Sequence, residues 1–194
     1  MTVEKTSNRQ RLSAVHVGGL AVLLLIGLWL VEWLLGRQFL SDSGFGAWTG
    51  AWSPDTSQWL ADPYTFSHVL HGIFFYWILL PARKRVDVGA RFLIACLLEV
   101  AWEILENSPF IIERYRTATA ARGYFGDSIL NSTCDLMAAM AGFWMAWKCN
   151  WKWVLGFVLA VELLCLYFVR DNLTLNVLML LHPSESIKQW QLGE

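Results

Sequence analysis

CLLEVAWEILEN, residues 96–107, is an apolar helical stretch interrupted by three glutamates, Glu99, Glu103 and Glu106. Side chains four and three residues apart lie on the same face of an α-helix, so the three carboxylates form one acidic stripe. A carboxylate near the centre of a bilayer costs about 2.5–3.5 kcal/mol, and three together require protonation, polar partners, water or a metal ion. The stretch therefore predicts a helix that faces a polar site.

The composition of the whole chain indicates a membrane protein. Of its 194 residues, 56% are hydrophobic and only 16% are charged, and the formal net charge is −1. The mean hydropathy is +0.41. A bilayer core of roughly 30 Å needs about 20 apolar residues per spanning helix, and several runs approach that length. We expect membrane lipids and no nucleic acid as partners, and the sequence does not indicate an oligomeric state.

The apolar runs predict an all-α fold, a polytopic transmembrane helix bundle that forms one integral membrane domain over residues 1–194. The first run is too long for a signal peptide and lacks a small-residue cleavage site, so it is predicted to be a signal anchor. A last apolar piece, residues 173–181, is too short to span and is predicted to be an interfacial or re-entrant segment. The five predicted spans cover residues 14–35, 63–80, 90–107, 127–147 and 153–169.

Short polar motifs predict where these spans begin and end. Asp62-Pro63 is typical of a helix start, with the aspartate as cap and the proline at the first position. Ser108-Pro109 is expected to stop the third span, because the residue before a proline avoids the helical region. Asp127 is either the amino-terminal cap of the fourth span or a site residue. The connections predicted to lack regular structure are residues 36–62 and 110–126.

The distribution of Lys and Arg predicts the orientation. The amino terminus, residues 82–91 and residues 148–152 together hold nine of them, and the opposite side holds six. By the positive-inside rule we place the amino terminus in the cytoplasm, with the chain in the inner (plasma) membrane of a bacterium. Spans two and four then begin, and spans three and five end, on the outer side. Their polar residues are predicted to line a funnel that opens outward.

Polar residues of the other spans complete the predicted site. His68 and His71 lie three residues apart on the second span, and Asn131 and Asp135 lie four apart on the fourth. A structural reading stays open, in which these groups are packed, hydrogen-bonded or paired with the arginines that follow the third span. The catalytic candidates are Glu99, Glu103, His68, His71 and Asp135. The substrate-binding candidates are Glu106, Asn107, Arg114, Tyr115, Arg116, Asp127 and Asn131.

Two classes of function fit these residues. The first is an intramembrane enzyme acting on an anionic lipid or polyprenyl-phosphate headgroup, with carboxylates and histidines as acid and base and with Arg114 and Arg116 holding the anion. If a divalent metal is bound, mixed His and carboxylate ligands fit zinc, manganese or iron, and its candidate ligands are His68, His71, Glu103 and Asp135. The alternative is a non-catalytic transporter, lipid-binding or accessory membrane protein.

The motif ExxWExxEN at 99–107, with ERYR at 113–116, YFGDSILNSTCD at 124–135 and the SHVLHG around the histidines, resembles a family of small multi-pass inner-membrane proteins of proteobacteria. The resemblance covers most of the chain. It implies the membrane location and brings no established reaction. A much weaker similarity is to VanZ-like membrane proteins, which share a glutamate on one span and an Arg/Asp/Asn pattern at the next.

Overall fold

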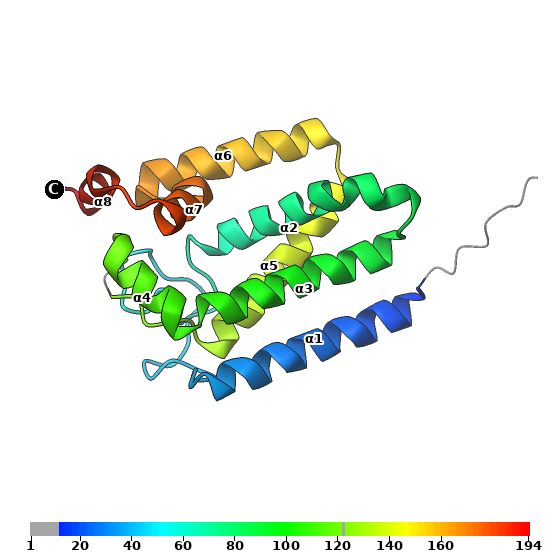
Figure 1. Cartoon of the computed structure of the whole chain (residues 1–194), viewed down its shortest axis with the longest axis horizontal. Helices are drawn as coiled ribbons and strands as arrows, with labels where there is room; N and C mark the ends of the chain where they lie inside the picture. The colour runs from blue at the N-terminus through cyan, green and yellow to red at the C-terminus, as the bar shows by residue number, and fades with distance from the viewer. Residues whose placement is uncertain (1–11, 122) are drawn as a thin grey trace, which may run out of the picture.

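A computed structural model describes residues 12–121 and 123–194, and the elements named in this part of the chain are all helices, joined by loops (Figure 1). The all-α prediction is confirmed. The helices are α1 (Ala14–Leu34), α2 (Thr65–Leu79), the 3-10 helix η1 (Leu80–Lys84), α3 (Val88–Glu106), α4 (Pro109–Ala118), α5 (Ile129–Lys148), α6 (Trp151–Val169), α7 (Leu173–Leu181) and α8 (Glu185–Leu192).

Three of the described helices are long and apolar enough to cross a membrane: α1, α2 extended through η1, and α6. Helices α3 and α5 have 19 and 20 residues but carry the polar side chains of the predicted site. The five-span arrangement therefore stays a prediction. At 1.5 Å per residue, the nine residues of α7 extend about 14 Å, which is too short for a bilayer core.

Side-chain caps explain the helix starts and correct two predictions. Helix α5, the predicted fourth span, is capped by Ser128, whose hydroxyl accepts from Asn131 N, so Asp127 is not the cap. Helix α2 begins at Thr65, and Asp62 instead accepts from the backbone N–H groups of Ser57 and Tyr64 in the preceding loop. Proline thus marks the helix start only approximately, because side-chain partners decide where the first turn closes.

Residues 109–118 form α4 and are not the irregular connection that the sequence predicts. Helix α3 does end before Pro109, as predicted, and its C-cap is Asn107. The Ser108 hydroxyl then accepts from Ile111 N and starts a new helix with Pro109 in its first turn. The same dipeptide therefore ends one helix and begins the next, so that α4 turns across the end of the bundle.

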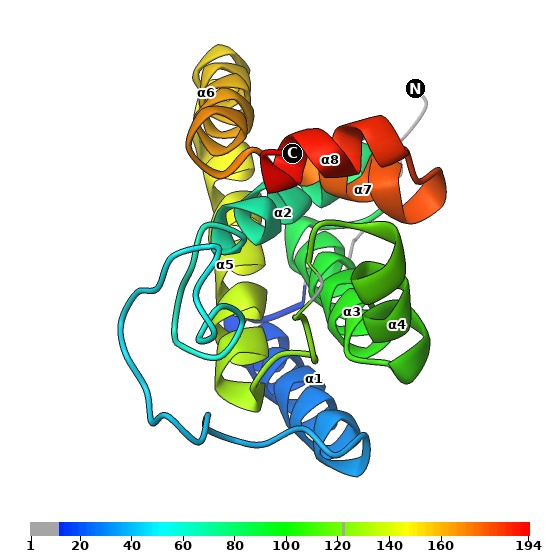
Figure 2. The same ribbon diagram turned by 90° about the vertical axis from the view of Figure 1, so that its left-hand side faces the viewer.

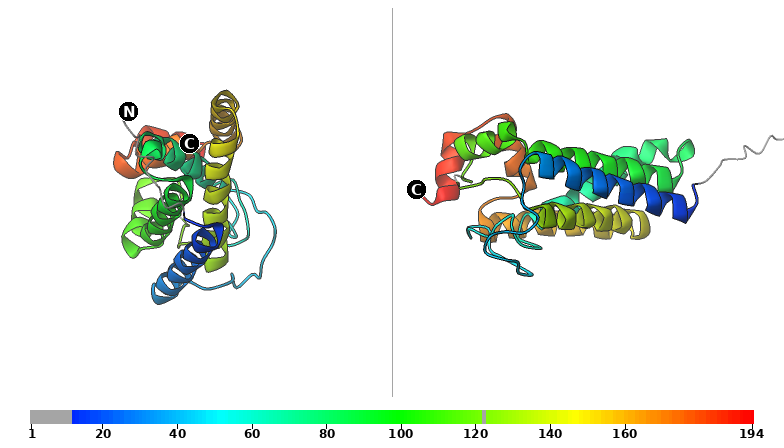
Figure 3. Two further views of the ribbon diagram at one scale, coloured as in Figure 1. Left: turned by 90° about the vertical axis from the view of Figure 1, so that its right-hand side faces the viewer. Right: turned by 90° about the horizontal axis from the view of Figure 1, so that it is seen from below.

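The long helices run lengthwise beside one another, with α4, α7 and α8 gathered at one end (Figures 1 and 3). We call this the site end and define it by residues 35–64, 107–128 and 170–194. Figure 2 looks onto it and shows the 35–64 loop beside α5, with α4 beside α3. Helices α2 and α5 begin there, and α1, α3 and α6 end there, which is the antiparallel arrangement that the sequence predicts.

Helices α2 and α5 cross in direct backbone contact. A Cβ atom on Gly72 would lie 1.8 Å from the Ala139 carbonyl oxygen, and one on Gly142 would lie 2.0 Å from that of Val69. Only glycine permits this approach, the small-residue packing common between membrane helices. It fixes the face of α2 that bears His68 against the face of α5 that bears Asp135.

The polarity of the molecule is inverted relative to a water-soluble bundle. Large apolar side chains are exposed on the outer helices, for example Leu23, Trp33, Leu163, Tyr167 and Phe168, each at least 63% exposed. Carboxylates of α1, α3 and α5 are buried inside. Such an apolar exterior is compatible with a bilayer, because water penalises exposed apolar surface and hydrocarbon does not.

Candidate functional site

Helices α2 and α3 bring two histidines against two glutamates, four of the five residues that the sequence predicts as catalytic. The His68 Nδ1 atom lies 2.6 Å from Glu99 Oε1 and 3.1 Å from Glu103 Oε1. The His71 Nδ1 atom lies 3.2 Å from Glu99 Oε2. Glu99 and Glu103 are completely buried and His68 is 7% exposed. The four side chains form a cluster that we call the His–Glu cluster.

Asp135, the fifth predicted catalytic residue, approaches the cluster from α5. Its Oδ2 atom lies 3.9 Å from His68 Nε2, on the opposite side of the imidazole from the glutamates. Asn131, one turn earlier, donates to the Trp59 carbonyl at 2.8 Å. Asn131 thus holds the 35–64 loop against the bundle, while Asp135 belongs to the cluster.

Glu103 is the unsatisfied member of the His–Glu cluster. Neither of its carboxylate oxygens has a hydrogen-bond partner among the described residues. The Asp135 Oδ1 atom also has no such partner. A single hydrogen on His68 Nδ1 serves the nearer Glu99, and His71 is directed to Glu99 as well. Leaving a buried carboxylate oxygen unpaired costs several kcal/mol unless a proton or cation occupies it.

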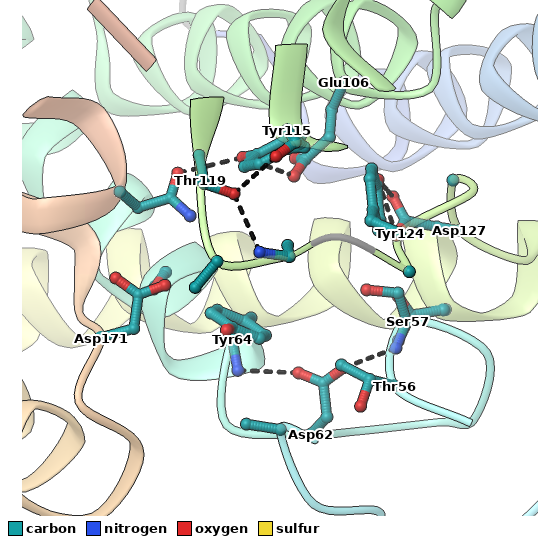
Figure 4. Close-up of a pocket in the computed structure, with 18 of the residues that line it drawn as sticks. Thr56, Ser57, Asp62, Tyr64, Glu106, Tyr115, Thr119, Tyr124, Asp127 and Asp171 are labelled. Carbon is teal, nitrogen blue, oxygen red and sulfur yellow. Dashed lines mark hydrogen bonds between the residues drawn. The ribbon is translucent and has the colours of Figure 1, made fainter. Parts of the chain in front are cut away.

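A second polar layer lies toward the site end. The Tyr115 hydroxyl is 3.0 Å from both Glu106 Oε1 and Asn176 Oδ1. A hydroxyl carries one hydrogen, so one of these neighbours must donate to it, either a protonated Glu106 or the Asn176 amide in its other orientation. Figure 4 shows Glu106 and Tyr115 directed at each other on one wall of a cavity.

The cavity has a volume of about 480 Å³ and lies at the site end between α2, α3, α4, α5 and α7. Its walls combine aromatic rings with five carboxylates and the two histidines of α2, and Asp62 and Tyr64 face Glu106 across it (Figure 4). Ligand cavities commonly enclose about 300–1,000 Å³. The lining carboxylates are Asp62, Glu106, Asp127, Asp135 and Asp171.

The two arginines predicted to hold an anion, Arg114 and Arg116, are not among the residues that line the cavity. Arg114 Nε donates to the Leu180 carbonyl at 3.0 Å, and Arg116 Nε donates to the Tyr124 carbonyl. No Lys or Arg is among the described residues that line the cavity. The arginines instead tie α4 to its neighbours. Of the basic residues counted for orientation, Lys5, Arg9, Arg11 and Arg122 lie outside the described residues.

Burial changes the acidity of groups at the rim of the cavity, outside the spanning helices. It raises the pKa of Asp62 above its usual range and raises the pKa of Asp171 to about 6. Burial, together with the neighbouring Glu106 carboxylate, also raises the pKa of the Tyr115 hydroxyl. These three groups at the rim therefore bind their protons more tightly than they would in water.

Asn107 and Asp127 form a hydrogen-bonded bridge from the cavity wall toward α1, and it leads to a residue that the sequence analysis does not include, Glu32. Asn107 Nδ2 lies 2.9 Å from Asp127 Oδ2 and 3.2 Å from Glu32 Oε1, and Asp127 N donates to Asn107 Oδ1. Glu32 is completely buried. The available signal was one acidic residue inside the apolar run of α1. Glu162, by contrast, caps the amino terminus of α7.

Comparison with known proteins supports the predicted family. The family described as "Protein of unknown function (DUF2585)" matches residues 33–193. A UPF0314 protein of Brucella anthropi is 44% identical over 90% of this chain and 92% of its own length. Its counterpart in Paracoccus denitrificans is 43% identical over 93% of this chain and 94% of its own length.

A UPF0314 protein of Sphingopyxis alaskensis is 48% identical over 82% of this chain and 86% of its own length. No solved structure matches the chain. The matches extend over nearly the whole bundle and both polar layers, so this chain belongs to the UPF0314 family of proteobacterial proteins.

Proposed function

We propose that this protein is a bacterial inner-membrane enzyme that acts on the headgroup of a lipid or lipid-linked molecule in the cavity at the site end. The observation that carries the proposal is the His–Glu cluster at the base of a cavity of about 480 Å³, in a bundle whose exterior is apolar. An amphiphile matches this arrangement, since its headgroup fits a polar cavity and its chains fit the surrounding bilayer.

The chemistry of the walls refines the substrate class. Five carboxylates and no described Lys or Arg line the cavity, so a headgroup that donates hydrogen bonds through hydroxyl or amine groups suits it. A phosphate in this surrounding needs an accompanying cation. We therefore propose a phospholipid or lipid-linked headgroup that carries hydroxyl or amine donors, in place of an anion held by Arg114 and Arg116.

The roles of the groups follow from their contacts. Glu99 accepts from His71 Nδ1, which orients the ring and leaves its other nitrogen to take a proton from a substrate hydroxyl or a water molecule. In the same cavity, the Tyr115 hydroxyl, which lies 3.0 Å from Glu106 Oε1, is the proton donor for the leaving group. A general base and a general acid that line one cavity are the arrangement that headgroup transfer or hydrolysis requires.

A transporter is the competing function, and the packing of the bundle argues against it. Beyond the His–Glu cluster, α2, α5 and α6 enclose an apolar core that includes Leu70, Ile73, Ala146, Val154 and Val158. The glycine-mediated contact between α2 and α5 adds close backbone packing to this apolar core. A site accessible from one side suits an enzyme.

The test compares the lipid composition of cells with and without this protein. We expect one headgroup class to accumulate in its absence. Expression of the wild type, or of the control variant His182→Gln at an exposed position, should restore the lipid profile. His71→Asn should fail to restore it. An unchanged lipid profile, together with altered ion or proton uptake into vesicles that contain the protein, would contradict the enzyme hypothesis and support a transporter.

A further inference from the structure

We propose that the cavity holds a divalent metal ion bound by His68, Glu103 and Glu106. The inference depends on the proposed function only for the use of the metal, because binding itself rests on geometry. The described residues contain two overlapping sets of donors within 4.8 Å of one another, His68–His71–Glu99 and His68–Glu103–Glu106. Contacts with other side chains distinguish the two sets.

The surroundings of Glu103 favour the second set, His68–Glu103–Glu106, as the metal site. Glu99 already receives the ring nitrogens of both histidines, whereas both oxygens of the completely buried Glu103 have no hydrogen-bond partner among the described residues. A buried carboxylate without a donor is a position that a cation stabilises. The ligand that is missing from the His–Glu cluster therefore belongs beside Glu103.

The distance between the donor atoms fits a metal. His68 Nδ1 and Glu103 Oε1 lie 3.1 Å apart. Metal bonds of about 2.0–2.2 Å at tetrahedral or octahedral angles place neighbouring ligand atoms about 2.9–3.5 Å apart. Glu106, one turn beyond Glu103, lines the cavity, so a metal bound there has a side open to the substrate.

The remaining residues of the cluster take supporting positions. When His68 Nδ1 binds the metal, the neutral ring takes the tautomer with its hydrogen on Nε2, and this N–H faces Asp135 Oδ2, which is 3.9 Å away. A carboxylate behind a metal-bound imidazole is a recurrent way to orient the ring. His71 stays paired with Glu99 as the base. One His with two carboxylates fits zinc, manganese or iron(II) and not a thiolate-preferring ion.

The metal content of the detergent-purified full chain tests the inference. Zn²⁺, Mn²⁺ or Fe²⁺ is added singly, the unbound ions are removed by dialysis, and the bound metal is measured. We expect about one ion per chain for one of these metals, the stoichiometry of a single-metal site. Glu103→Gln and Glu106→Gln should each weaken binding by at least about tenfold. His71→Asn and the exposed control Glu113→Gln should bind as the wild type does.

Three results would overturn the assignment: a wild type that binds none of the three ions, glutamine variants that bind normally, or loss of binding in His71→Asn with retention in Glu106→Gln. Because a variant can fail to fold, helix content is measured alongside, and the visible spectrum of the Co²⁺-loaded wild type reports mixed nitrogen and oxygen ligands without any substitution. If the protein binds none of these metals but still changes lipid headgroups, the metal site is rejected and the proposed function stands. If the protein binds a metal but the lipid profile is unchanged, the metal site stands and the proposed function is rejected.

Discussion

Asp171 lies at the rim of the cavity, and burial raises its pKa from 3.8 to about 6. A carboxyl group that binds its proton more tightly in the folded chain favours folding at low pH. Its favourable contribution is complete below about pH 3.8 and is lost as the pH rises through about 6. The upper limit of this loss is about 3 kcal/mol, and partial exposure of the side chain reduces it.

The variant Asp171→Asn isolates this effect, because it keeps the oxygen that accepts from Gln191 Nε2 and Asn172 N. We expect the variant to unfold at a higher temperature than the wild type at pH 7.5, with the difference vanishing near pH 4. Thermal unfolding in detergent across this range measures it. A difference that stays constant with pH would show that Asp171 is not protonated more readily in the folded chain.

Residue spacing explains why much of the site was predictable. Glu99, Glu103, His68 and His71 follow helical periods on two neighbouring antiparallel helices, so local pattern and topology bring them together. Arg114 and Arg116 were assigned to an anion from charge alone, whereas their partners are carbonyl groups of Leu180 and Tyr124. A backbone acceptor is invisible in sequence, since every residue carries one.

The crossing of α2 and α5 decides whether the two halves of the site meet. Gly72→Ala would place a methyl group 1.8 Å from the Ala139 carbonyl oxygen, which forces the helices apart. We expect destabilisation of at least about 1–3 kcal/mol and loss of lipid activity. The matched control is Gly156→Ala on α6, where a Cβ meets nothing within 4 Å.

Unfolding free energies of both variants in mixed micelles provide the measurement. Alanine has the higher helix propensity, so Gly156→Ala should be neutral or stabilising by up to about 1 kcal/mol. Equal stability of the two variants would mean that the backbone contact does not hold α2 against α5. The sequence placed these glycines in helices but not at a contact, because helix pairing is a long-range property.

Helix α4 shows where element prediction from the sequence fails. The segment 109–118 is polar and follows a serine–proline stop, so the sequence favours a loop. Its Ser108 cap and its contacts with α7, through Arg114 and through Tyr115 with Asn176, supply the stabilisation that local pattern did not reveal. Tertiary contacts routinely override weak intrinsic preferences of this kind.

The site end lies at one end of the whole molecule, and its orientation in the membrane is a testable expectation. In a chain without native cysteines, single cysteines at the exposed positions Pro54 and Thr117 should react with an impermeant maleimide added outside the inner membrane. A cysteine at the exposed position Arg85 should react only after the membrane is permeabilised. Labelling of Arg85→Cys alone would reverse the orientation and make the cavity open to the cytoplasm.

The backbone contact between α2 and α5 also has an electrical consequence. In an energised inner membrane we expect the apolar half that this contact closes to act as an insulator, so that most of the membrane potential falls across that half and little across the cavity. Moving one charge through the full potential involves about 2.3 kcal/mol per 100 mV. A cation or headgroup that enters the site end crosses only a small part of this field. We therefore expect occupancy of the cavity to be insensitive to whether the cell is energised.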